Sequence, residues 1–453
     1  MRILAGHALL PEGWRERVAV TIADGRIDAI ELSASSLPGD MRIPALLPAL
    51  SNLHSHTFQR GMAGMSEVRG AASDSFWTWR EVMYKFVDHL TPDDIEAIAA
   101  MAFVEMQEGG FAAVAEFHYV HHQHGGGTYA NIAELSGRIF NAARQTGIGL
   151  THLPVLYAFG GAGEKPLAGG QSRFGNDFDR YLKLQEAVRG ALSAMPDDTA
   201  IGCAPHSLRA VNPAMLSDVI SAFGNGPFHI HIAEQTKEVE DINAWLGARP
   251  VEWLLDNAPV GSNWCLIHAT HMDETETRRA AQSGAVAGLC PITESSLGDG
   301  IFNGLDWIAN HGNYGIGSDS NIRISAPLEL ATLEYSQRLK HRQRNVMAAG
   351  PGSTGMMLYT KALAGGAQAL GRASGAIKAG LWADLAAINT DHPALCALRP
   401  EQWLDGLIFA APDGAITDLW SAGRHRVKAG RHIAREAVEK SYRRTMRNLM
   451  SRM

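Results

Sequence analysis

The chain has 453 residues, of which 46% are hydrophobic and 19% charged, and its formal net charge is −7. This length suits one large domain with a smaller one, and the composition is that of a globular protein with a large core. The negative charge argues against a nucleic-acid-binding protein, because such proteins usually carry a basic excess. No hydrophobic leader follows Met1 and no apolar run approaches about 20 residues, so we expect a cytoplasmic protein without membrane contact.

The cysteines and the C-terminal tail bear on compartment and partners. The four cysteines are widely spaced with no CxxC pair, which argues against a disulfide framework and favours a reducing compartment. Residues 424–453 carry ten Lys or Arg against two Glu. Such a tail could contact a membrane or RNA, but a solvated helix face is the favoured interpretation.

Short β-like segments occur at both ends of the chain. Residues 17–22 and 27–32 are separated by a turn, and similar segments recur at 383–388 and 415–420. Neither end has enough apolar residues for a core of its own. We therefore expect one small β-sandwich made from residues 1–50 and 377–431, followed by a C-terminal helix at 432–453.

Between these ends, residues 51–376 alternate apolar strand-like runs with helical segments. Eight such units predict a (β/α)8 barrel, and near-continuous apolar runs are typical of parallel strands covered on both faces. A doubly wound open sheet is the alternative, but it would not bring the ends of the first, fifth, sixth and eighth strands together. The expected strands are 45–52, 112–120, 148–159, 200–208, 228–235, 264–271, 285–293 and 314–321.

Reactive side chains follow four of these strands. His54 and His56 flank one residue, and alternate residues of a strand point to the same face. His231, His268 and Asp319 stand at the corresponding ends of later strands. Active sites of barrel enzymes lie at these carboxyl ends. Imidazoles with a carboxylate form a site suited to zinc, with iron or manganese as alternatives.

This constellation resembles the amidohydrolase superfamily over essentially the whole chain, including the late segment Gly380-Leu381-Trp382-Ala383-Asp384-Leu385. The resemblance implies that the metal ligands are His54, His56, His231 and Asp319. It also implies that Glu234 of His231-Ile232-Ala233-Glu234 is the proton shuttle, and that His268 lies beside the water that the metal activates. Asp319 would take the proton from that water.

The expected fourth strand, which reads Ile201-Gly202-Cys203-Ala204-Pro205-His206, contains no lysine. Two-metal members of the superfamily carry a bridging lysine there, so a single ion is expected. One divalent ion can lower the pKa of a bound water to about 7. The chemistry implied is hydrolytic loss of ammonia from a carbon–nitrogen double bond.

Three strings, at 76–80, 204–209 and 290–300, resemble formimidoylglutamate deiminases, enzymes of histidine degradation. Their substrate carries two carboxylates and a cationic formimidoyl group, so its pocket should hold guanidinium groups. Arg80 and Arg209 are the candidates. Arg80 follows two tryptophans, so it could instead be a surface stacking partner.

Other residues near the expected barrel mouth could bind substrate. By the same resemblance, Gln59 could bind an amide or carboxylate, Tyr119 could donate a phenol hydrogen bond, and His206 could face the substrate. Gln59 and Tyr119 could equally be packing residues. His229 is interpreted as barrel interior, and the cluster of histidines at 118–124 as a loop without fixed geometry.

The resemblance leaves other functions open. A nucleobase or pterin deaminase on the same barrel would need a flat, aromatic pocket and no Arg209. A non-catalytic metal-binding barrel is a third candidate, disfavoured because the metal and proton-transfer residues are all present. The expected partner is a small dicarboxylate substrate, and we expect a homodimer.

Overall fold

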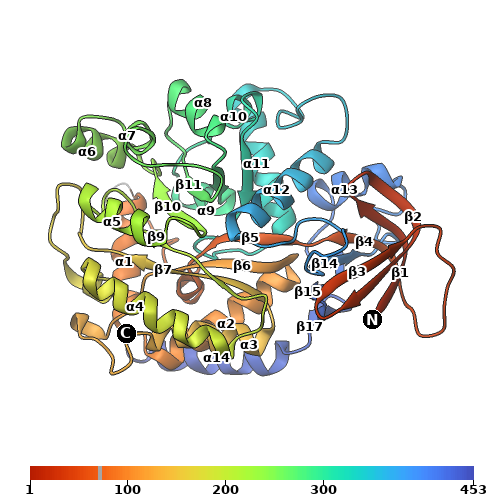
Figure 1. The fold of residues 1–453 in the computed structure, drawn as a ribbon, viewed down its shortest axis with the longest axis horizontal. Helices are drawn as coiled ribbons and strands as arrows, with labels where there is room; N and C mark the ends of the chain where they lie inside the picture. Colours follow the sequence, from red (N-terminus) through yellow and green to blue (C-terminus); the bar gives the residue numbers. More distant parts are fainter. Residues whose placement is uncertain (70–73) are drawn as a thin grey trace.

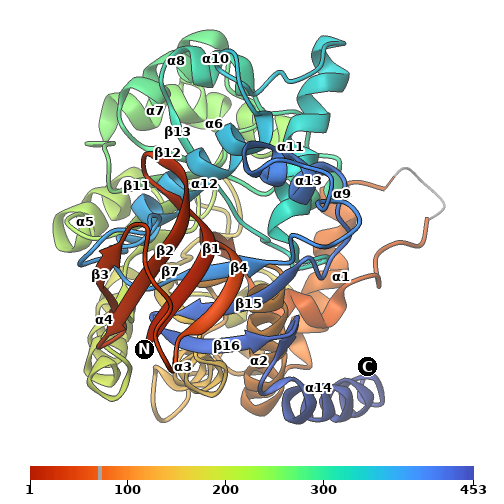
Figure 2. The same ribbon diagram turned by 90° about the vertical axis from the view of Figure 1, so that its right-hand side faces the viewer.

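The computed structural model describes residues 1–69 and 74–453 of the chain. It has two parts, a parallel barrel surrounded by helices and a sheet domain (Figures 1 and 2). The fold class expected from the sequence is confirmed, a (β/α)8 barrel with a small β domain built from both chain ends, although this domain, expected as a β-sandwich, is one continuous hydrogen-bonded sheet. In Figure 1 the first four strands (red) lie to the right of the barrel, beside β14 and β15.

The sheet domain is a single hydrogen-bonded sheet of eight strands in the order β17-β16-β15-β14-β4-β1-β2-β3. The two chain ends meet where β4 pairs with β14 antiparallel, while β4 pairs with β1 parallel. The strands are β1 (Arg2–Leu10), β2 (Gly13–Ala23), β3 (Arg26–Glu31), β4 (Met41–Pro48), β14 (Leu385–Ile388), β15 (Ile416–Ser421), β16 (Arg424–Lys428) and β17 (Arg431–His432).

The barrel strands form two parallel sheets, β5-β6-β7-β8 with β9 paired to β7, and β10-β11-β12-β13. Isolated bridges join them: Cys203 to Phe228 and Ser207 to His231 on one side, and Ser55 to Asp319 on the other. The strands are β5 (Leu50–Ser55), β6 (Phe111–His118), β7 (Gly149–Leu156), β8 (Ala200–Ile201), β9 (Ala204–Pro205), β10 (Phe228–Ile232), β11 (Trp264–His268), β12 (Val286–Leu289) and β13 (Asn313–Ile316).

Fourteen α-helices are present among the described residues. They are α1 (Phe76–Asp88), α2 (Pro92–Glu108), α3 (Glu134–Thr146), α4 (Phe178–Ala191), α5 (Pro213–Phe223), α6 (Thr236–Leu246), α7 (Pro250–Asn257), α8 (Glu274–Gln282), α9 (Pro291–Leu297), α10 (Gly304–Ala309), α11 (Ala326–His341), α12 (Thr354–Leu370), α13 (Trp403–Phe409) and α14 (Arg435–Met450). Short 3-10 helices are η1 (Thr57–Met62), η2 (His124–Gly126), η3 (Gly169–Arg173), η4 (Leu192–Ala194) and η5 (Pro400–Gln402).

The structure corrects several strand boundaries. The run expected at 200–208 is divided into β8 and β9, and the run expected at 285–293 ends as a strand at Leu289, with α9 beginning at Pro291. The apolar run expected as one strand at 45–52 is divided between β4 of the sheet domain and β5 of the barrel. The change of partner occurs at Ala49, whose N–H donates to the Asp384 carbonyl, and at Leu50, whose N–H donates to the Gly110 carbonyl. The sequence does not reveal this change of sheet, because β4 and β5 are both buried here and together read as one continuous apolar run.

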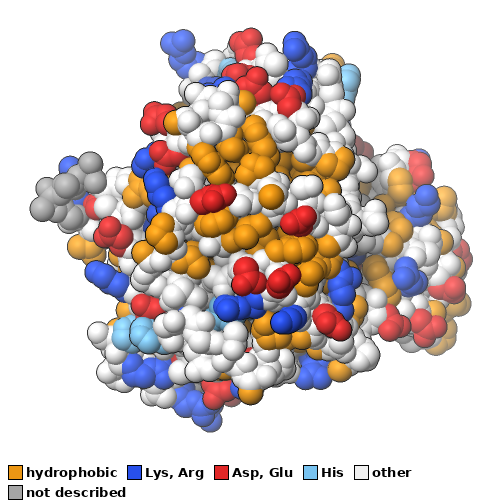
Figure 3. All heavy atoms as spheres, turned by 60° about the vertical axis from the view of Figure 1, so that its left-hand side comes forward, with side chains coloured by type: hydrophobic (Ala, Val, Ile, Leu, Met, Phe, Trp, Pro, Cys, Tyr) orange, Lys and Arg blue, Asp and Glu red, His pale blue; other side chains and the backbone are white. Residues whose placement is uncertain are grey.

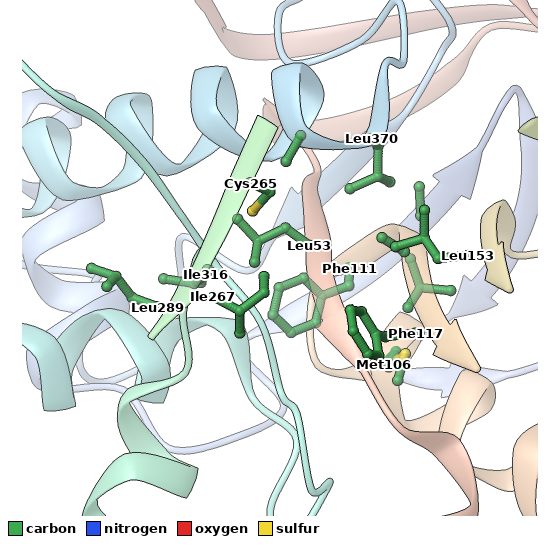
Figure 4. Close-up of a cluster of buried hydrophobic side chains, with 14 of the residues drawn as sticks. Leu53, Met106, Phe111, Phe117, Leu153, Cys265, Ile267, Leu289, Ile316 and Leu370 are labelled. Atoms are coloured by element: carbon green, nitrogen blue, oxygen red, sulfur yellow. The ribbon is translucent and has the colours of Figure 1, made fainter. Parts of the chain in front are cut away.

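Apolar side chains from most barrel strands meet in one large core. Figure 4 shows Leu53, Phe111, Phe117, Leu153, Ile267, Leu289 and Ile316 converging from β5, β6, β7, β11, β12 and β13, with Leu370 of α12 beside them. Glycines let the first and last strands approach closely: a Cβ at Gly317 would lie 2.7 Å from the His54 carbonyl oxygen. A smaller core, including Val18, Val20, Leu385 and Trp420, fills the sheet domain.

Two further expectations concern disulfide bonds and membrane-spanning helices. All four cysteines are free, and three of them are buried. Within residues 1–69 and 74–453, each helix is too short or too polar to cross a bilayer.

A buried charge network joins the barrel to the sheet domain. The Arg372 guanidinium donates to both Asp384 carboxylate oxygens, at 2.7 and 3.0 Å, and to Asp198, at 3.0 Å. Arg424 of β16 also donates to Asp198, at 2.6 Å. The side chains of Arg372, Asp384 and Asp198 are at most 4% exposed. Buried carboxylates are costly without a cationic partner, so this network ties the two parts together.

We expect Arg372→Met to lower the free energy of unfolding by about 3–5 kcal/mol, because the buried Asp384 carboxylate loses its cationic partner and Asp198 keeps only Arg424. Thermal and denaturant unfolding of the metal-saturated protein would measure the change. Arg323→Met is the control, because Arg323 pairs with Asp413 on the surface, with side chains 61% and 59% exposed, and such pairs contribute little. Equal effects of the two substitutions would contradict this role.

Candidate active site

Four side chains from three barrel strands converge at the carboxyl end of the barrel. His54 lies on β5 and His56 directly follows it, His231 lies on β10, and Asp319 follows β13. The Nε2 atoms of His54 and His231 are 3.1 Å apart. Asp319 Oδ1 lies 3.5 Å from His54 Nε2 and 3.4 Å from His56 Nε2. The donor atoms of the four predicted ligands lie in two overlapping groups that share His54, one formed with His56 and His231 and the other with His268 and Asp319, and within each group they are at most 4.8 Å apart.

The outer nitrogens of two of these rings are held by backbone carbonyls. His56 Nδ1 lies 2.8 Å from the Phe117 carbonyl oxygen, and His231 Nδ1 lies 3.0 Å from that of His206. A carbonyl can only accept, so Nδ1 carries the hydrogen and Nε2 keeps its lone pair for the centre of the site. Such outer hydrogen bonds fix the orientation of metal-binding histidines.

The electrostatics of the cluster suit a bound cation. Burial, together with the neighbouring His54, lowers the pKa of His56 to about 3, and burial places the pKa values of His54 and His231 well below their usual range. The Nε2 atoms of His54 and His231, 3.1 Å apart, can both face a cation when neither carries a hydrogen. Three nitrogens and a carboxylate oxygen are the donor set of a mononuclear zinc site. The residues present therefore fit a divalent ion.

The proton-transfer residues expected from the sequence lie next to this cluster. His268 Nε2 is 3.9 Å from Glu234 Oε1 and 3.8 Å from Asp319 Oδ2. Burial raises the pKa of Glu234, while His268 and Arg209 oppose the rise. Burial alone would lower the pKa of His268, but Glu234, the hydrogen bond to Glu294 and Asp319 together raise it to about 10. Glu234 and His268 can thus each hold a proton next to the predicted metal ligands.

Several residues of the site have left-handed backbone conformations that are uncommon outside glycine. The φ angles are +68° at His268, +49° at Ala269 and +44° at Asp319. Such conformations cost on the order of 1–3 kcal/mol each and concentrate at functional sites. Their position at the ends of β11 and β13 shows that the surrounding structure holds these side chains against the local preference of the backbone.

A cavity opens beside this group of histidines and Asp319. Its lining includes every site residue proposed from the sequence except His54, which lies beneath it with no exposed surface. Arg209 is buried in the cavity wall, where its Nη2 donates to Glu234 Oε2 at 3.2 Å. Arg80 is half-buried on α1 and also stacks on Trp77, with its guanidinium carbon 4.6 Å from the ring centroid. Arg80 therefore both lines the cavity and stacks on Trp77.

Three polar side chains complete the wall as expected. Gln59 on η1 donates to the Tyr119 hydroxyl at 2.7 Å, so that hydroxyl can direct its own hydrogen elsewhere. Burial keeps the pKa of Tyr119 well above its usual value, so the phenol stays protonated. Burial and the nearby Arg209 lower the pKa of His206, which is therefore a neutral ring at the wall. His229 is fully buried and bonded to the Ala369 carbonyl, as its interpretation as barrel interior requires.

The structure adds residues that the sequence did not single out. Glu238 accepts from the backbone N–H groups of Ala233 and Glu234, and its carboxylate lies 3.7 Å from Arg209 Nε. It stands at the third position of α6, and an acidic residue there is a known capping signature that could have identified it. Tyr84, Tyr157 and the aromatic residues Phe76, Trp79 and Phe174 also line the cavity. Phe76 and Trp79 lie in the string 76–80 that carries the resemblance, whereas no local motif marks Tyr84 on α1, Tyr157 after β7 or Phe174 after η3.

The expectation for the histidine cluster at 118–124 is wrong for three of its four members. His118 ends β6, and His121 and His122 are buried. His121 Nε2 bonds to the Val155 carbonyl and His122 Nε2 to that of Gly175. Only His124 is exposed. Contacts with segments that are distant in sequence fix the positions of the His121 and His122 rings. Among the described residues, the potential metal-binding groups involve none of these histidines.

Comparison with known proteins supports this arrangement. The model of the amidohydrolase family matches residues 45–426, and that of "Formimidoylglutamate deiminase HutF, N-terminal domain" matches residues 1–43. The chain is 47% identical to the formimidoylglutamate deiminase of Pseudomonas aeruginosa over 97% of both chains. It is 26% identical to a 5-methylthioadenosine/S-adenosylhomocysteine deaminase of Natronomonas pharaonis, over 87% of this chain and 85% of the relative.

Solved structures agree. A crystal structure of an amidohydrolase from Brucella melitensis has a TM-score of 0.95 and 47% identity, with 99% of both chains covered. A zinc-bound adenosine deaminase from Xanthomonas campestris, 22% identical, shares the fold, with a TM-score of 0.83 over 99% of this chain and 98% of that one. With a family model spanning most of its length and a relative at 47% identity, the chain belongs to the amidohydrolase family and, within it, to the formimidoylglutamate deiminases.

Proposed function

We propose that this chain hydrolyses N-formimidoyl-L-glutamate to N-formyl-L-glutamate and ammonia with one divalent metal ion, a step of histidine degradation. One observation carries the proposal: a single cavity joins the histidine and aspartate cluster, the Glu234–His268 pair and two guanidinium groups. The relative at 47% identity bears the name of this activity. Zinc suits the donor set, and Fe2+ or Mn2+ could replace it.

Arg80 and Arg209 are the proposed partners of the two substrate carboxylates. A guanidinium binds a carboxylate through two parallel hydrogen bonds, and this interaction strengthens when water is excluded. Arg209 is buried beside Glu234, so a carboxylate on Arg209 would place the rest of the substrate against the proton-transfer residues. Gln59, Tyr119 and His206 would supply further polar contacts.

The residues of the cavity can carry out the proton transfers. A divalent ion held by His54, His56, His231 and Asp319 would supply an activated water at neutral pH. Asp319 accepts a proton from that water, and His268 holds the water between itself and Asp319. Glu234 delivers protons to the terminal nitrogen of the substrate. The water oxygen becomes the formyl oxygen, the C=N bond breaks, and the nitrogen leaves as ammonia, so atoms balance.

The aromatic lining of the cavity favours a second candidate, deamination of a nucleobase or pterin. Phe76, Trp79, Tyr84 and Tyr157 could stack on a flat ring. Such a ring would have no use for the buried Arg209. Ammonia release from a panel of formimidoyl amino acids and free bases separates the two functions, and turnover of a base without turnover of formimidoylglutamate would exclude the first.

We expect Glu234→Gln to reduce turnover by about 100-fold or more, because an amide cannot transfer the proton. Metal content should stay near one ion per chain, since the carboxylate is not among the four ligands proposed above. Ammonia release and metal analysis on the same preparation would measure both. Glu240→Gln, at an exposed position on the following helix α6, is the matched control. Full activity of Glu234→Gln would remove this residue from the mechanism.

Arg209→Met should lower kcat/KM for formimidoylglutamate by about 30-fold or more, the effect of losing about 2 kcal/mol from a buried charge pair. KM should rise because the guanidinium binds a carboxylate of the substrate, and kcat should also fall because Arg209 pairs with Glu234. Arg278→Met, at an exposed position on α8, serves as the control. An unchanged KM would contradict the assignment of Arg209 to a carboxylate.

Metal analysis of the purified chain should give one zinc ion per chain. His231→Ala should reduce this content, since it removes one of four donors. Two ions per chain in the unsubstituted protein would contradict the single-ion site.

We also propose that the protein is a cytoplasmic homodimer. The four free cysteines suit a reducing compartment. Figure 3 shows one face on which hydrophobic side chains gather, bordered by charged ones, and such areas commonly mark protein interfaces. Light scattering of the purified protein tests the oligomeric state.

A further inference from the structure

The Glu294 carboxylate contacts His268 on the side of the ring that faces away from the predicted metal ligands. It lies in the first turn of α9, after β12. Its Oε1 lies 3.2 Å from His268 Nδ1 and accepts from the Cys290 N–H at 2.8 Å. The side chain is 8% exposed and that of His268 is 1% exposed. This carboxylate oxygen therefore links the ends of two neighbouring barrel strands, β11 and β12.

The hydrogen bond to Glu294 decides which ring atom faces the cluster. With Nδ1 bonded to Glu294, His268 presents Nε2 to Glu234 and Asp319, at 3.9 and 3.8 Å. A half-turn of the ring about the Cβ–Cγ bond would replace Nε2 by the carbon Cε1. A carbon there could neither donate to nor accept from a water molecule.

The backbone at His268 does not hold the ring by itself. His268 and the following Ala269 both have left-handed φ angles, +68° and +49°, which are unfavourable for side chains with a Cβ. Neighbouring rings contribute only edge or stacking contacts: His231 is parallel to His268 at 5.6 Å and His54 is edge-on at 6.0 Å. The directional contact on Nδ1 comes from Glu294.

We propose that Glu294 is a positioning residue that fixes the orientation of His268 and keeps the hydrogen on its Nδ1, so that Nε2 faces the reacting water. Glu294 acts through His268, because among the described residues it is not part of the cavity lining. This role rests on the proposed hydrolysis but not on the identity of the substrate.

The kinetic test compares Glu294→Ala and Glu294→Gln with the unsubstituted holoenzyme. We expect Glu294→Ala to lower kcat about 10- to 100-fold, the usual effect of removing an outer partner of a metal-site histidine, with KM within twofold and metal content near one per chain. Glu294→Gln keeps an acceptor oxygen and should recover part of the loss. Glu274→Ala, an exposed position on α8, should match the unsubstituted enzyme.

The spectroscopic test reads the ring directly. In 15N-histidine-labelled protein, the signals assigned to His268 by their loss in His268→Gln should show a hydrogen on Nδ1, and Glu294→Ala should remove that signal. A His268 Nδ1 without hydrogen in the unsubstituted protein would overturn the proposal, whether or not the variants fold. So would a Glu294→Ala variant that loses its metal or raises KM at constant kcat.

The two proposals fail in different ways. If formimidoylglutamate is not turned over but another imine or base is, the proposed substrate is wrong and the kcat comparison is made with that other substrate. The NMR result on His268 does not depend on turnover.

Discussion

The close approach of buried donor atoms from distant barrel strands is the constraint on which the rest of the structure depends. His54 Nε2 lies 3.1 Å from His231 Nε2 and 3.5 Å from Asp319 Oδ1, although these residues come from β5, β10 and the end of β13. Closing the barrel requires β5 to meet β13, which the Ser55–Asp319 bridge and the close approach at Gly317 achieve. A barrel brings these ends together, whereas an open sheet would separate the first strand from the last.

Buried charge around this point explains how one cavity can combine substrate binding with proton transfer. Arg209 lies 3.2 Å from Glu234 and 3.7 Å from Glu238, while His268 lies between Glu234 and Glu294. Each buried carboxylate thus has a cationic or hydrogen-bonding partner, which is the condition for burying it. In the proposed reaction the substrate carboxylate and the reacting nitrogen meet neighbouring members of the same network, so substrate binding and proton transfer share their groups.

The metal ligands and the barrel could be predicted because both follow from patterns among residues that are close in sequence. Alternation along a strand places His54 and His56 on one face, and the repeated strand–helix pattern gives the fold. Partners that are distant in sequence could not be predicted: Glu294 is 26 residues from His268, and only packing brings them together. The change of sheet at Ala49 was hidden for a different reason, because β4 and β5 are both buried and read as one apolar run. His121 and His122 precede glycines, yet their positions are set by carbonyls of segments beyond residue 150.

The products formed from N-formimidoyl-L-glutamate test the central claim most directly, because the molecule has two carbon–nitrogen bonds that water could break. NMR of the reaction mixture with the metal-loaded protein would identify them. Delivery of the proton by Glu234 to the terminal nitrogen predicts N-formyl-L-glutamate and ammonia in equal amounts. Formation of formamide and glutamate, or no turnover while a nucleobase is deaminated, would contradict it.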